Sequence, residues 1–407
     1  MSITFDVAVI GNGMIGAAAS RYLSAAGLST LAIGPGEPDN WQNHEGVFAS
    51  HYDQGRITRI IDPNDVWSLL GARSIAAYGE LETTSGVQFH HPVGCLRVSP
   101  FYQQPDDTLA QAAAHGDRHG AEYTVRDDVA LREPFPFLQF APGSTILWER
   151  GGAGYVNPRS LVQAQLTAAQ QQGATLVRET VQRLEKLEDG IALHTVEGNV
   201  YTAAKVLVAA GAYSNHILGE HVLDVTPRAV SILKAQIRPT EADRLSTMPS
   251  IIYRLQENPT LSSIYCLPPV EYPDGLIYIK IGGTLRQSVH RYSHQELAEW
   301  FHGPGNPEET DALRGVLLEM IPDLEVEAFD TKPCVVTYTA HDHPYIDVVD
   351  SPSTDTGRIF VATGGSGSSA KSSNELGRIA ALLVQYGVWT YDVDHSHFKA
   401  RFSQPAA

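Results

Sequence analysis

Three groups of residues in this chain have the types and spacing that chemistry requires. The first is the turn at residues 11–16, which reads G-N-G-M-I-G and so fits G-x-G-x-x-G. In such a turn Gly11 permits the tight bend, Gly13 lets the backbone approach a pyrophosphate, and Gly16 lets a helix pack against a strand. Free N–H groups at the start of that helix then favour negative charge. The turn therefore predicts a dinucleotide site.

The second group is a set of cations whose positions suggest an anionic ligand. Arg56 and Arg59 lie three residues apart, so on a turn they converge, and guanidinium groups bind carboxylates through two parallel hydrogen bonds. Lys371 stands at the expected start of a helix, where a cation is mildly unfavourable unless a ligand holds it. Lys280 lies in the apolar run L-I-Y-I-K-I-G, where its burial is costly without a partner or a cavity. The alternative for each is a cation exposed to solvent.

The third group is the stretch K-P-C-V-V-T-Y-T-A-H-D-H-P-Y-I-D at residues 332–347. Cys334 lies in an apolar strand, where a lone cysteine is usually a small core residue. Tyr338 shares its strand face, because side chains repeat every two residues. His341 and His343 lie on one side of the chain, but no third ligand follows at a recognised spacing, so we expect a turn there and no metal. The three cysteines form no CxxC, which argues against a disulfide framework or a zinc site.

The N-terminal segment predicts the scaffold for the first group. Residues 5–10 are apolar enough for a buried parallel strand, a helix follows the turn, and residues 29–33 give a second apolar strand. This βαβ unit has the length expected for a dinucleotide site. The acidic residue that usually ends the second strand and binds the ribose is replaced by Gly34. The first carboxylate is Glu37, which either reaches back or leaves that role to backbone groups and water.

Hydrophobic periodicity predicts further helices and many short strands along the chain. Helices are expected at residues 66–83, 103–115, 157–172, 295–302, 307–320 and 374–386. A strand is expected at 176–179, and residues 181–184 are an optional continuation of it. Residues 191–195 and 200–202 are expected to pair as a hairpin, and further strands are expected at 206–209, 231–237, 276–281 and 358–362. The last strand leads into a second Gly-rich turn, T-G-G-S-G-S-S. No linker separates these elements, so we expect two discontinuous domains woven together.

Composition limits what the protein can bind. The 407 residues are 43% hydrophobic and 18% charged, as in ordinary globular proteins, and the formal net charge is −17. That acidity argues against nucleic acid and against an anionic membrane surface, because both require a surplus of Lys and Arg. No apolar run is long enough to span a bilayer, and the first strand leaves no room for a signal peptide before it. We expect a cytoplasmic protein that is a monomer or a small homo-oligomer.

At several places the chain resembles the superfamily of FAD-dependent D-amino-acid oxidase and glycine oxidase, and above all its branch of monomeric sarcosine oxidase and N-methyltryptophan oxidase. In the first half of the chain, three blocks match the family: the first Gly-rich turn, residues 50–60 (S-H-Y-D-Q-G-R-I-T-R-I), which resemble the family's S-H-H-G-D-T-R-I-I-R, and residues 205–214, which resemble its strand ending in G-A-W or G-A-Y. In the second half, residues 278–282 resemble the family's L-K-I-G, residues 334–347 its C-M-Y-T-x-T-x-D-x-x-F-x-x-D, and residues 364–371 its G-F-S-G-H-G-x-K. The order and spacing of these blocks carry the resemblance.

The resemblance implies an α/β (α+β) fold of the glutathione-reductase type. In it, a Rossmann-like FAD-binding domain at residues 1–85, 150–222 and 330–407 interweaves with a β-rich substrate domain at residues 86–149 and 223–329. The residues expected to contact FAD are Gly11, Gly13, Met14, Ile15, Gly16, Glu37, Ser50, Arg56, Val181, Gly211, Cys334, Gly364, Gly365, Ser366, Gly367 and Lys371.

The resemblance also implies roles for single residues. Lys280 is expected to be the site of oxygen reduction, and the other expected catalytic residues are Arg56 and Tyr52. Arg59 and Lys371 are expected to hold the substrate carboxylate, with Tyr338 in the substrate pocket. Cys334 is expected to form a thioether to the 8α-methyl group of the flavin. The family pattern is altered at Tyr52, Thr284 and Val336, which line the expected substrate pocket and put sarcosine itself in doubt.

The function implied is that of an FAD-dependent amine oxidase. It oxidises the C–N bond of a carboxylate-bearing secondary amine, either an N-methyl or a cyclic amino acid, and reduces oxygen to hydrogen peroxide. Three alternatives stay open: a flavin dehydrogenase that passes electrons to a quinone or a protein, an oxidase of a cyclic imino acid or a specialised-metabolite amine, and a non-catalytic dinucleotide-binding protein. The Arg, Lys and Cys matches argue against the last.

Overall fold

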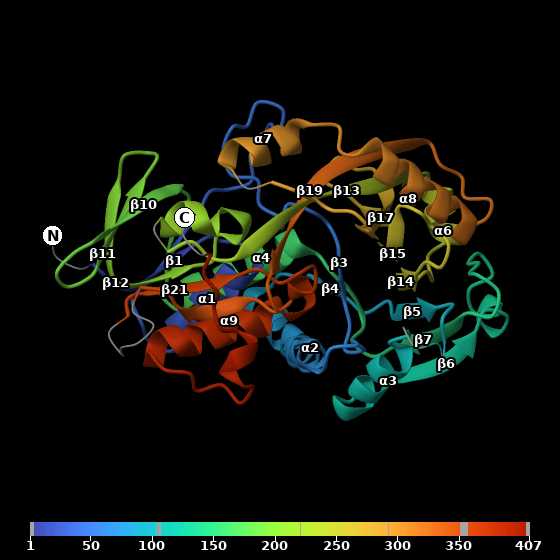
Figure 1. Ribbon diagram of the computed structural model, residues 1–407, viewed down its shortest axis with the longest axis horizontal. Coiled ribbons are helices and arrows are strands. Elements are labelled where there is room, and N and C mark those ends of the chain that lie inside the picture. The colour runs from blue at the N-terminus through green and yellow to red at the C-terminus, as the bar shows by residue number, and fades with distance from the viewer. Residues whose placement is uncertain are drawn as a thin grey trace.

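Two large β-sheets and one small sheet form the frame of the molecule, with helices packed along them (Figure 1). This computed structural model describes residues 4–102, 104, 107–219, 221–291, 293–350 and 357–403. The fold class expected from the sequence is confirmed, because a mostly parallel sheet that contains the βαβ unit is joined to a larger β-rich sheet.

The first sheet has eight strands and contains the predicted βαβ unit. β1 (Phe5–Ile10), α1 (Met14–Ala25) and β2 (Thr30–Ile33) follow one another, and β2 lies parallel to β1. The other strands are β9 (Thr175–Val177), β10 (Val181–Lys186), β11 (Ile191–Thr195), β12 (Val200–Val208), β20 (Tyr345–Val348) and β21 (Ile359–Thr363). Their order is β10-β11-β12-β1-β2-β9, with β21 beside β12 and β20 beside β21. The apolar runs explain why β1, β2 and β21 can be buried at the centre.

Two strand predictions are wrong. The sequence predicts separate strands at 200–202 and 206–209, but they form the single strand β12, whose first half pairs with β11 and whose second half pairs with β1 and β21. The optional continuation of 176–179 into 181–184 also fails, because β9 and β10 lie at opposite edges of the sheet. Apolar alternation runs through the turn at Glu179 and Thr180 and therefore does not reveal it.

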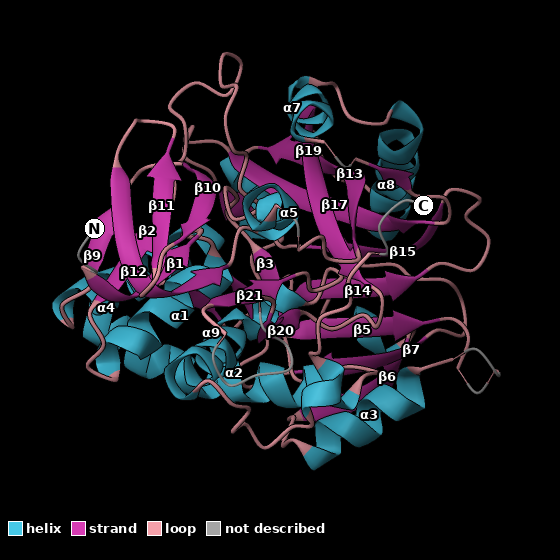
Figure 2. Ribbon diagram, turned by 60° about the vertical axis from the view of Figure 1, so that its left-hand side comes forward, coloured by secondary structure: helices cyan, strands magenta, loops and turns pink. Residues whose placement is uncertain are grey.

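Four helices pack against one another along one face of this sheet (Figure 2). They are α1, α2 (Asp65–Ser85), α4 (Pro158–Gln171) and α9 (Ser369–Tyr386). The side chains of Asn64 and Asn157 accept hydrogen bonds from backbone N–H groups in the first turns of α2 and α4. These N-caps fix where the two helices begin. α9 begins earlier than the predicted 374, because its polar first turn is buried against neighbouring helices. That early start brings Lys371 into the helix.

The second sheet has ten strands in the order β18-β13-β17-β15-β14-β5-β7-β6, with β16 beside β17 and β19 beside β13. The strands are β5 (Cys95–Ser99), β6 (Tyr123–Asp127), β7 (Thr145–Glu149), β13 (Val225–Ile237), β14 (Ser250–Arg254), β15 (Leu261–Cys266), β16 (Val270–Glu271), β17 (Ile277–Leu285), β18 (Val289–His290) and β19 (Ala328–Thr339). One face packs on α8 (Pro307–Met320), which buries Leu313 and Leu317 against Ile279 and Ile281. The opposite face therefore carries the intervening residues, including Lys280.

The remaining elements are a small third sheet, further helices and short 3-10 turns. The small sheet is β3 (Arg56–Thr58), β8 (Gly154–Val156) and β4 (His90–His91), and β3 begins at Arg56. The other helices are α3 (Leu109–Arg118), α5 (Ser214–Leu218), α6 (Pro239–Arg244) and α7 (His294–His302), with 3-10 turns at Ala130–Arg132, Gly211–Tyr213 and His395–His397. The helix predicted at 103–115 corresponds to α3, which begins only at Leu109 and ends at Arg118, and residues 103, 105 and 106 lie outside the described part of the chain.

The expected boundary at residue 330 falls inside β19, which pairs along its length with β13 of the second sheet. In the part of the chain that the structure describes, no helix combines the length and apolar character needed to cross a bilayer.

Candidate functional site

A cavity of about 490 Å³ is lined by residues from both large sheets. On one side, its wall is formed where β1, β12 and β21 end and lead into the next segments. In an open α/β sheet this carboxyl end is where ligands bind. On the other side, β13, β15, β17 and β19 contribute residues of the second sheet. The cavity therefore lies where the two expected functions, cofactor binding and substrate binding, meet.

The Gly-rich turn after β1 is shaped for a close ligand. Gly11 has a φ of +105°, and a Cβ there would lie 2.5 Å from the carbonyl oxygen of Ala209. Four polar atoms on cavity-wall residues are buried and have no hydrogen-bond partner in the described structure: Asn12 Oδ1, the Tyr52 hydroxyl, Arg59 Nε and Ser366 Oγ. Unmet polar atoms beside a tight backbone cradle and a helix N-terminus fit a dinucleotide.

Most residues that the sequence singles out line this cavity. They are Gly11, Gly13, Met14, Ile15, Ser50, Tyr52, Arg56, Arg59, Val181, Gly211, Cys334, Tyr338, Gly364, Gly365, Ser366, Gly367 and Lys371. Thr284 and Val336, the altered pocket positions, are also in the wall. The fold thus brings together, in one cavity wall, residues that are more than 300 positions apart in the sequence.

Three of the expected residues do not line the cavity. Gly16 is not among the residues of the cavity wall. A Cβ at this position would be 1.9 Å from the carbonyl oxygen of Gly11, so Gly16 serves the close packing of α1 against the turn. Glu37 does not reach back to the cavity, because Arg159 binds both of its carboxylate oxygens at 2.6 and 2.7 Å. Lys280 is 1% exposed and lies outside the wall.

The two cations expected to hold a carboxylate converge on Asp62. Arg59 Nη2 donates to Asp62 Oδ2 at 2.9 Å, and Lys371 Nζ donates to the same oxygen at 2.6 Å. Burial raises the pKa of Asp62, but the charges of Lys371 and Arg59 outweigh this and hold it well below its usual range. Burial, with help from Arg59, lowers the pKa of Lys371 to about 8. Arg59 Nε has no partner among the described residues and is free to donate to a ligand.

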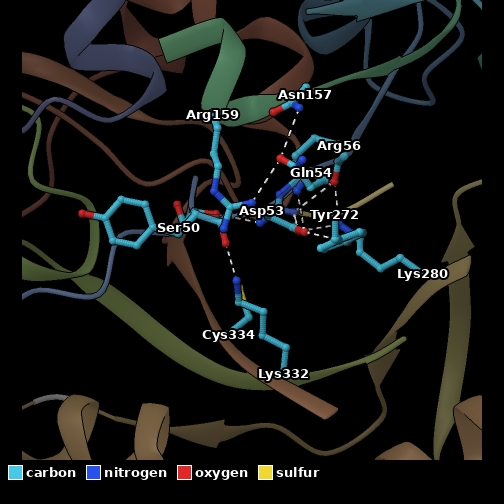
Figure 3. A network of polar contacts seen from close by, with 12 residues as sticks. Ser50, Asp53, Gln54, Arg56, Asn157, Arg159, Tyr272, Lys280, Lys332 and Cys334 are labelled. Carbon is cyan, nitrogen blue, oxygen red and sulfur yellow. Dashed lines mark hydrogen bonds and ion pairs between the residues drawn. The ribbon is translucent and has the colours of Figure 1, made fainter. Parts of the chain in front are cut away.

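A second cluster is centred on Asp53 (Figure 3). Its Oδ2 accepts from Lys280 Nζ at 2.6 Å and from Arg56, while its Oδ1 accepts from the Tyr272 hydroxyl at 2.9 Å. Lys280 Nζ also donates to the carbonyl oxygen of Gly55 at 2.5 Å. Burial lowers the pKa of Lys280 well below its ordinary value, and the charge of Arg56 adds to this lowering. Arg56 joins the cluster to the cavity, because it lines the wall and also donates to the carbonyl oxygen of Ser50 at 2.7 Å.

Cys334 approaches the same region from β19, together with Lys332 (Figure 3). The two residues share one face of the strand, and Cys334 is in the cavity wall with 9% of its surface exposed. Lys332 donates to the carbonyl oxygen of Tyr52, and its Nζ lies 4.3 Å from the centre of the Trp41 ring. Burial lowers the pKa of Lys332 to about 7. A lysine that can lose its charge therefore lies within electrostatic reach of the thiol.

Sequence reasoning missed three important residues. Asp53 and Asp62 lie three positions from Arg56 and Arg59 respectively, and an Arg–Asp spacing of three is a signal for an ion pair on a turn. Tyr265 also lines the cavity, 5.6 Å from Lys280 measured from Nζ to the ring centre. The strand sequence around Tyr265 gives no sign of that role.

The histidines after β19 have structural partners. His341 Nε2 lies 3.0 Å from the carbonyl oxygen of Lys399, and His343 Nε2 lies 3.1 Å from Asn64 Oδ1. Within the described ranges, no group of three or more His, Cys, Asp or Glu side chains is arranged to hold a metal ion.

Comparison with known proteins adds a family and several relatives. Residues 6–383 match the model of the family described as FAD dependent oxidoreductase. The chain is 27% identical to monomeric sarcosine oxidase from Streptomyces avermitilis, over 97% of both proteins. It is 24% identical to N-methyl-L-tryptophan oxidase from Yersinia pestis, over 94% of this chain and 95% of that protein.

Solved structures show the same fold. NikD, described as an unusual amino acid oxidase essential for nikkomycin biosynthesis, superposes with a TM-score of 0.77 at 19% identity, and the match covers all of both chains. Glycine oxidase from Geobacillus kaustophilus superposes with a TM-score of 0.71 at 19% identity, over 99% of this chain and 100% of that chain. At these identities the likeness concerns the fold alone.

Proposed function

This chain belongs to the family of FAD-dependent oxidoreductases, and on that premise we propose that it oxidises the C–N bond of an amine that carries a carboxylate. The observation that carries this proposal is the composition of one cavity wall. The same wall contains the two Gly-rich turns, which suit a dinucleotide, and the cations Arg59 and Lys371, which suit a carboxylate.

The cofactor would be held at the start of α1 and in the turn before α9. Backbone N–H groups of residues 11–15 would bind the pyrophosphate, and Ser366 Oγ and the Tyr52 hydroxyl offer unmet hydrogen bonds. Glu37 is committed to Arg159, so Asn12 Oδ1, which has no partner in the described structure, is the group available for the ribose. When bound, FAD supplies the chemistry of accepting two electrons from the amine.

Arg59 and Lys371 would bind and orient the substrate carboxylate. Asp62 holds both cations through one oxygen, so their donors are fixed before a substrate arrives. Such preorganisation reduces the entropy lost on binding and fixes the C–N bond relative to the cofactor. The free Nε of Arg59 and the remaining protons of Lys371 are the donors that face an incoming carboxylate.

A secondary amine, with an N-methyl group or a ring, is the substrate class we propose. The named relatives act on sarcosine and N-methyl-L-tryptophan, and both are N-methyl amino acids. Thr284 and Val336 are small residues in the cavity wall and leave room for a side chain larger than that of sarcosine. The amine loses two electrons and two protons to give an imine, which water hydrolyses.

Oxygen is the proposed electron acceptor. It takes up two electrons and two protons and leaves as hydrogen peroxide. Lys280 would assist this step through its charge, because a fixed cation in a dry site stabilises developing negative charge. A dehydrogenase with a different acceptor is the second candidate. The observation that favours it is that Lys280 lies outside the cavity wall and is paired with Asp53.

We also propose that Cys334 bonds covalently to the flavin through a thioether to the 8α-methyl group. Forming this S–C bond would break the thiol S–H bond and one methyl C–H bond, and the flavin would take up the two electrons and pass them to oxygen. Its place in the cavity wall and its electrostatic neighbours Lys332 and Lys280 support this role. Acid precipitation tests it: a yellow pellet is expected from the wild-type protein and a colourless pellet from Cys334→Ser. A colourless wild-type pellet above a yellow supernatant would mean that the flavin is held by contacts alone.

The proposed function is tested by a visible spectrum and a substrate panel. The purified protein should show flavin absorption that is bleached, without air, by sarcosine, N-methyl-L-tryptophan or L-proline, and admission of air should release peroxide. Bleaching without peroxide would favour the dehydrogenase. A protein that stays colourless after incubation with FAD would contradict the proposal.

A further inference from the structure

Lys280 occupies a position that a charged lysine could not hold alone. It lies in the middle of β17 between Ile279 and Ile281, which are both fully buried, and it is itself 1% exposed. Removing an ammonium group from water favours its neutral form. The nearby cations oppose its charge further, since Arg56 and Lys332 both lower the pKa of Lys280.

The carboxylate that contacts Lys280 is that of Asp53, which is 2% exposed. This carboxylate is fixed in orientation. The Tyr272 hydroxyl and the backbone N–H of Gln54 donate to Oδ1 at 2.9 and 2.8 Å, which leaves Oδ2 for Lys280 and Arg56. Asp53 therefore holds a lysine behind the cavity and an arginine in its wall through one oxygen (Figure 3).

Asp53 departs from the family segment that residues 50–60 resemble. Without a gap, S-H-Y-D-Q-G-R aligns with S-H-H-G-D-T-R, so that Asp53 stands where that segment has glycine, and Gln54 where it has aspartate. The carboxylate is thus shifted by one position along the chain. Asp53, at this position, contacts Lys280.

We propose that Asp53 is a positioning residue that keeps Lys280 protonated and thereby sets the pH range in which the reduced enzyme reacts with oxygen. The inference rests on the proposed function, because it takes Lys280 as the cation that assists oxygen reduction. Asp53 stabilises the charged form through a contact of 2.6 Å, and the carbonyl of Gly55 accepts a second proton of the ammonium group. Without the carboxylate, burial and Arg56 act unopposed, so Lys280 gives up its proton at a lower pH.

The other titratable groups around Lys280 are cations, cysteines and a tyrosine. They are Arg56 on β3, Lys332 and Cys334 on β19, Lys234 on β13, and Tyr265 and Cys266 on β15. Burial raises the pKa of Cys266 and of Tyr265, so neither supplies a negative charge near neutral pH. Asp53 is therefore the group whose removal should matter most.

The test compares the flavin-loaded wild type with Asp53→Asn, Lys280→Met and the double variant. Each protein is photoreduced and mixed with oxygenated buffer between pH 6 and 10. The wild-type rate constant should fall at high pH, and in Asp53→Asn the midpoint of this fall should move down by at least about one pH unit, which is about tenfold in the proton equilibrium. Lys280→Met should be slow at every pH, and the double variant should equal it.

A second readout reports on the lysine itself. The chain has seven lysines, so the ¹³Cε signal of Lys280 can be assigned by its absence in Lys280→Met and titrated by NMR. The signal should titrate at a lower pH in Asp53→Asn. Asp274→Asn is the matched control, because Asp274 lies exposed in the turn before β17 and contacts Tyr278 rather than Lys280. Neither readout should move in that control.

The outcomes separate the two claims. An unchanged Lys280 titration in Asp53→Asn would overturn the inference. A shifted titration, combined with wild-type reoxidation in Lys280→Met, would leave Asp53 as the residue that sets the charge and would overturn the oxygen role of Lys280. If Asp53→Asn does not fold, Asp53→Ser removes the same carboxylate with a smaller side chain and should also shift both midpoints downward, whereas no shift would overturn the inference.

Discussion

Asp53 and Asp62 form two clusters of the same composition with different access to the cavity. Each aspartate is buried and uses its Oδ2 to hold one arginine three residues away and one lysine from a distant segment. Around Asp62, both the arginine and the lysine line the cavity wall. Around Asp53, only the arginine does, and the lysine lies behind it.

The difference shows how one arrangement can serve two purposes. A buried Arg–Asp–Lys cluster fixes two positive charges, and burial of the lysine makes that charge sensitive to pH. Where both cations face the cavity, they can bind an anion directly. Where the lysine lies outside the cavity wall, we expect its charge to act on the contents of the cavity from a distance.

The largest effect that separates the clusters is expected from Arg59→Gln. Loss of charged hydrogen bonds to a carboxylate costs about 1.5–3 kcal/mol, so kcat/KM for a carboxylate-bearing amine should fall roughly 10- to 100-fold. A similar N-methyl amine without the carboxylate should be affected much less. Steady-state kinetics on both substrates measure this. Arg56→Gln is the comparison, and it should change both substrates by the same factor.

Replacing each of the two lysines by methionine should separate the roles of the two clusters. Lys280→Met should slow reoxidation by oxygen by roughly tenfold, below the effect of losing a donor in direct contact, and leave anaerobic reduction nearly unchanged. Lys371→Met should do the reverse, raising KM for the carboxylate substrate and leaving reoxidation nearly unchanged. Stopped-flow measurements of the two half-reactions test both variants. If the two lysines affect the same half-reaction, the division of roles is wrong.

A pH effect should follow from Lys371. Because burial lowers its pKa to about 8, it is charged below that pH and loses its charge above it. A simple carboxylate inhibitor such as propionate should therefore bind well below pH 8 and about tenfold more weakly for each pH unit above it. Titration of the flavin spectrum with propionate avoids the protonation of an amine substrate. Lys371→Met should bind weakly at every pH.

The smallest effect is expected from the pair of Glu37 and Arg159, which resembles the two clusters in composition but is partly exposed. With side-chain exposures of 30% and 25%, it should contribute no more than about 1 kcal/mol to the free energy of unfolding. Glu37→Gln should also retain FAD, because Glu37 lies outside the cavity wall. Urea unfolding and the FAD content after gel filtration measure both. Loss of FAD would mean that Glu37 serves the ribose after all.

Much of the fold follows from local sequence patterns. The βαβ unit and α8, whose bounds agree with the predicted 307–320, are segments with strong periodicity and clear caps. The sequence predicts the convergence of Arg59 and Lys371 through the resemblance. It does not predict the break between β9 and β10, because apolar alternation continues across it.

The contacts that decide the site are long-range and leave little trace in the sequence. Asp53 meets Lys280 of the second sheet, and Asp62 meets Lys371 where α2 packs against α9, over separations of 227 and 309 residues. The early start of α9 has a similar cause, because its polar first turn is stabilised by burial rather than by helix propensity. Pattern reasoning therefore finds the cations and misses the carboxylates that position them.

The most direct test of the central claim is anaerobic titration of the flavin-loaded protein with matched amines. N-methyl amino acids should bleach the flavin band, the same amines without the carboxylate should do so at least about tenfold less efficiently, and Arg59→Gln should remove this preference. Equal bleaching by both kinds of amine, or no bleaching by any amine, would contradict the claim that the Asp62 cluster binds the substrate carboxylate beside the cofactor.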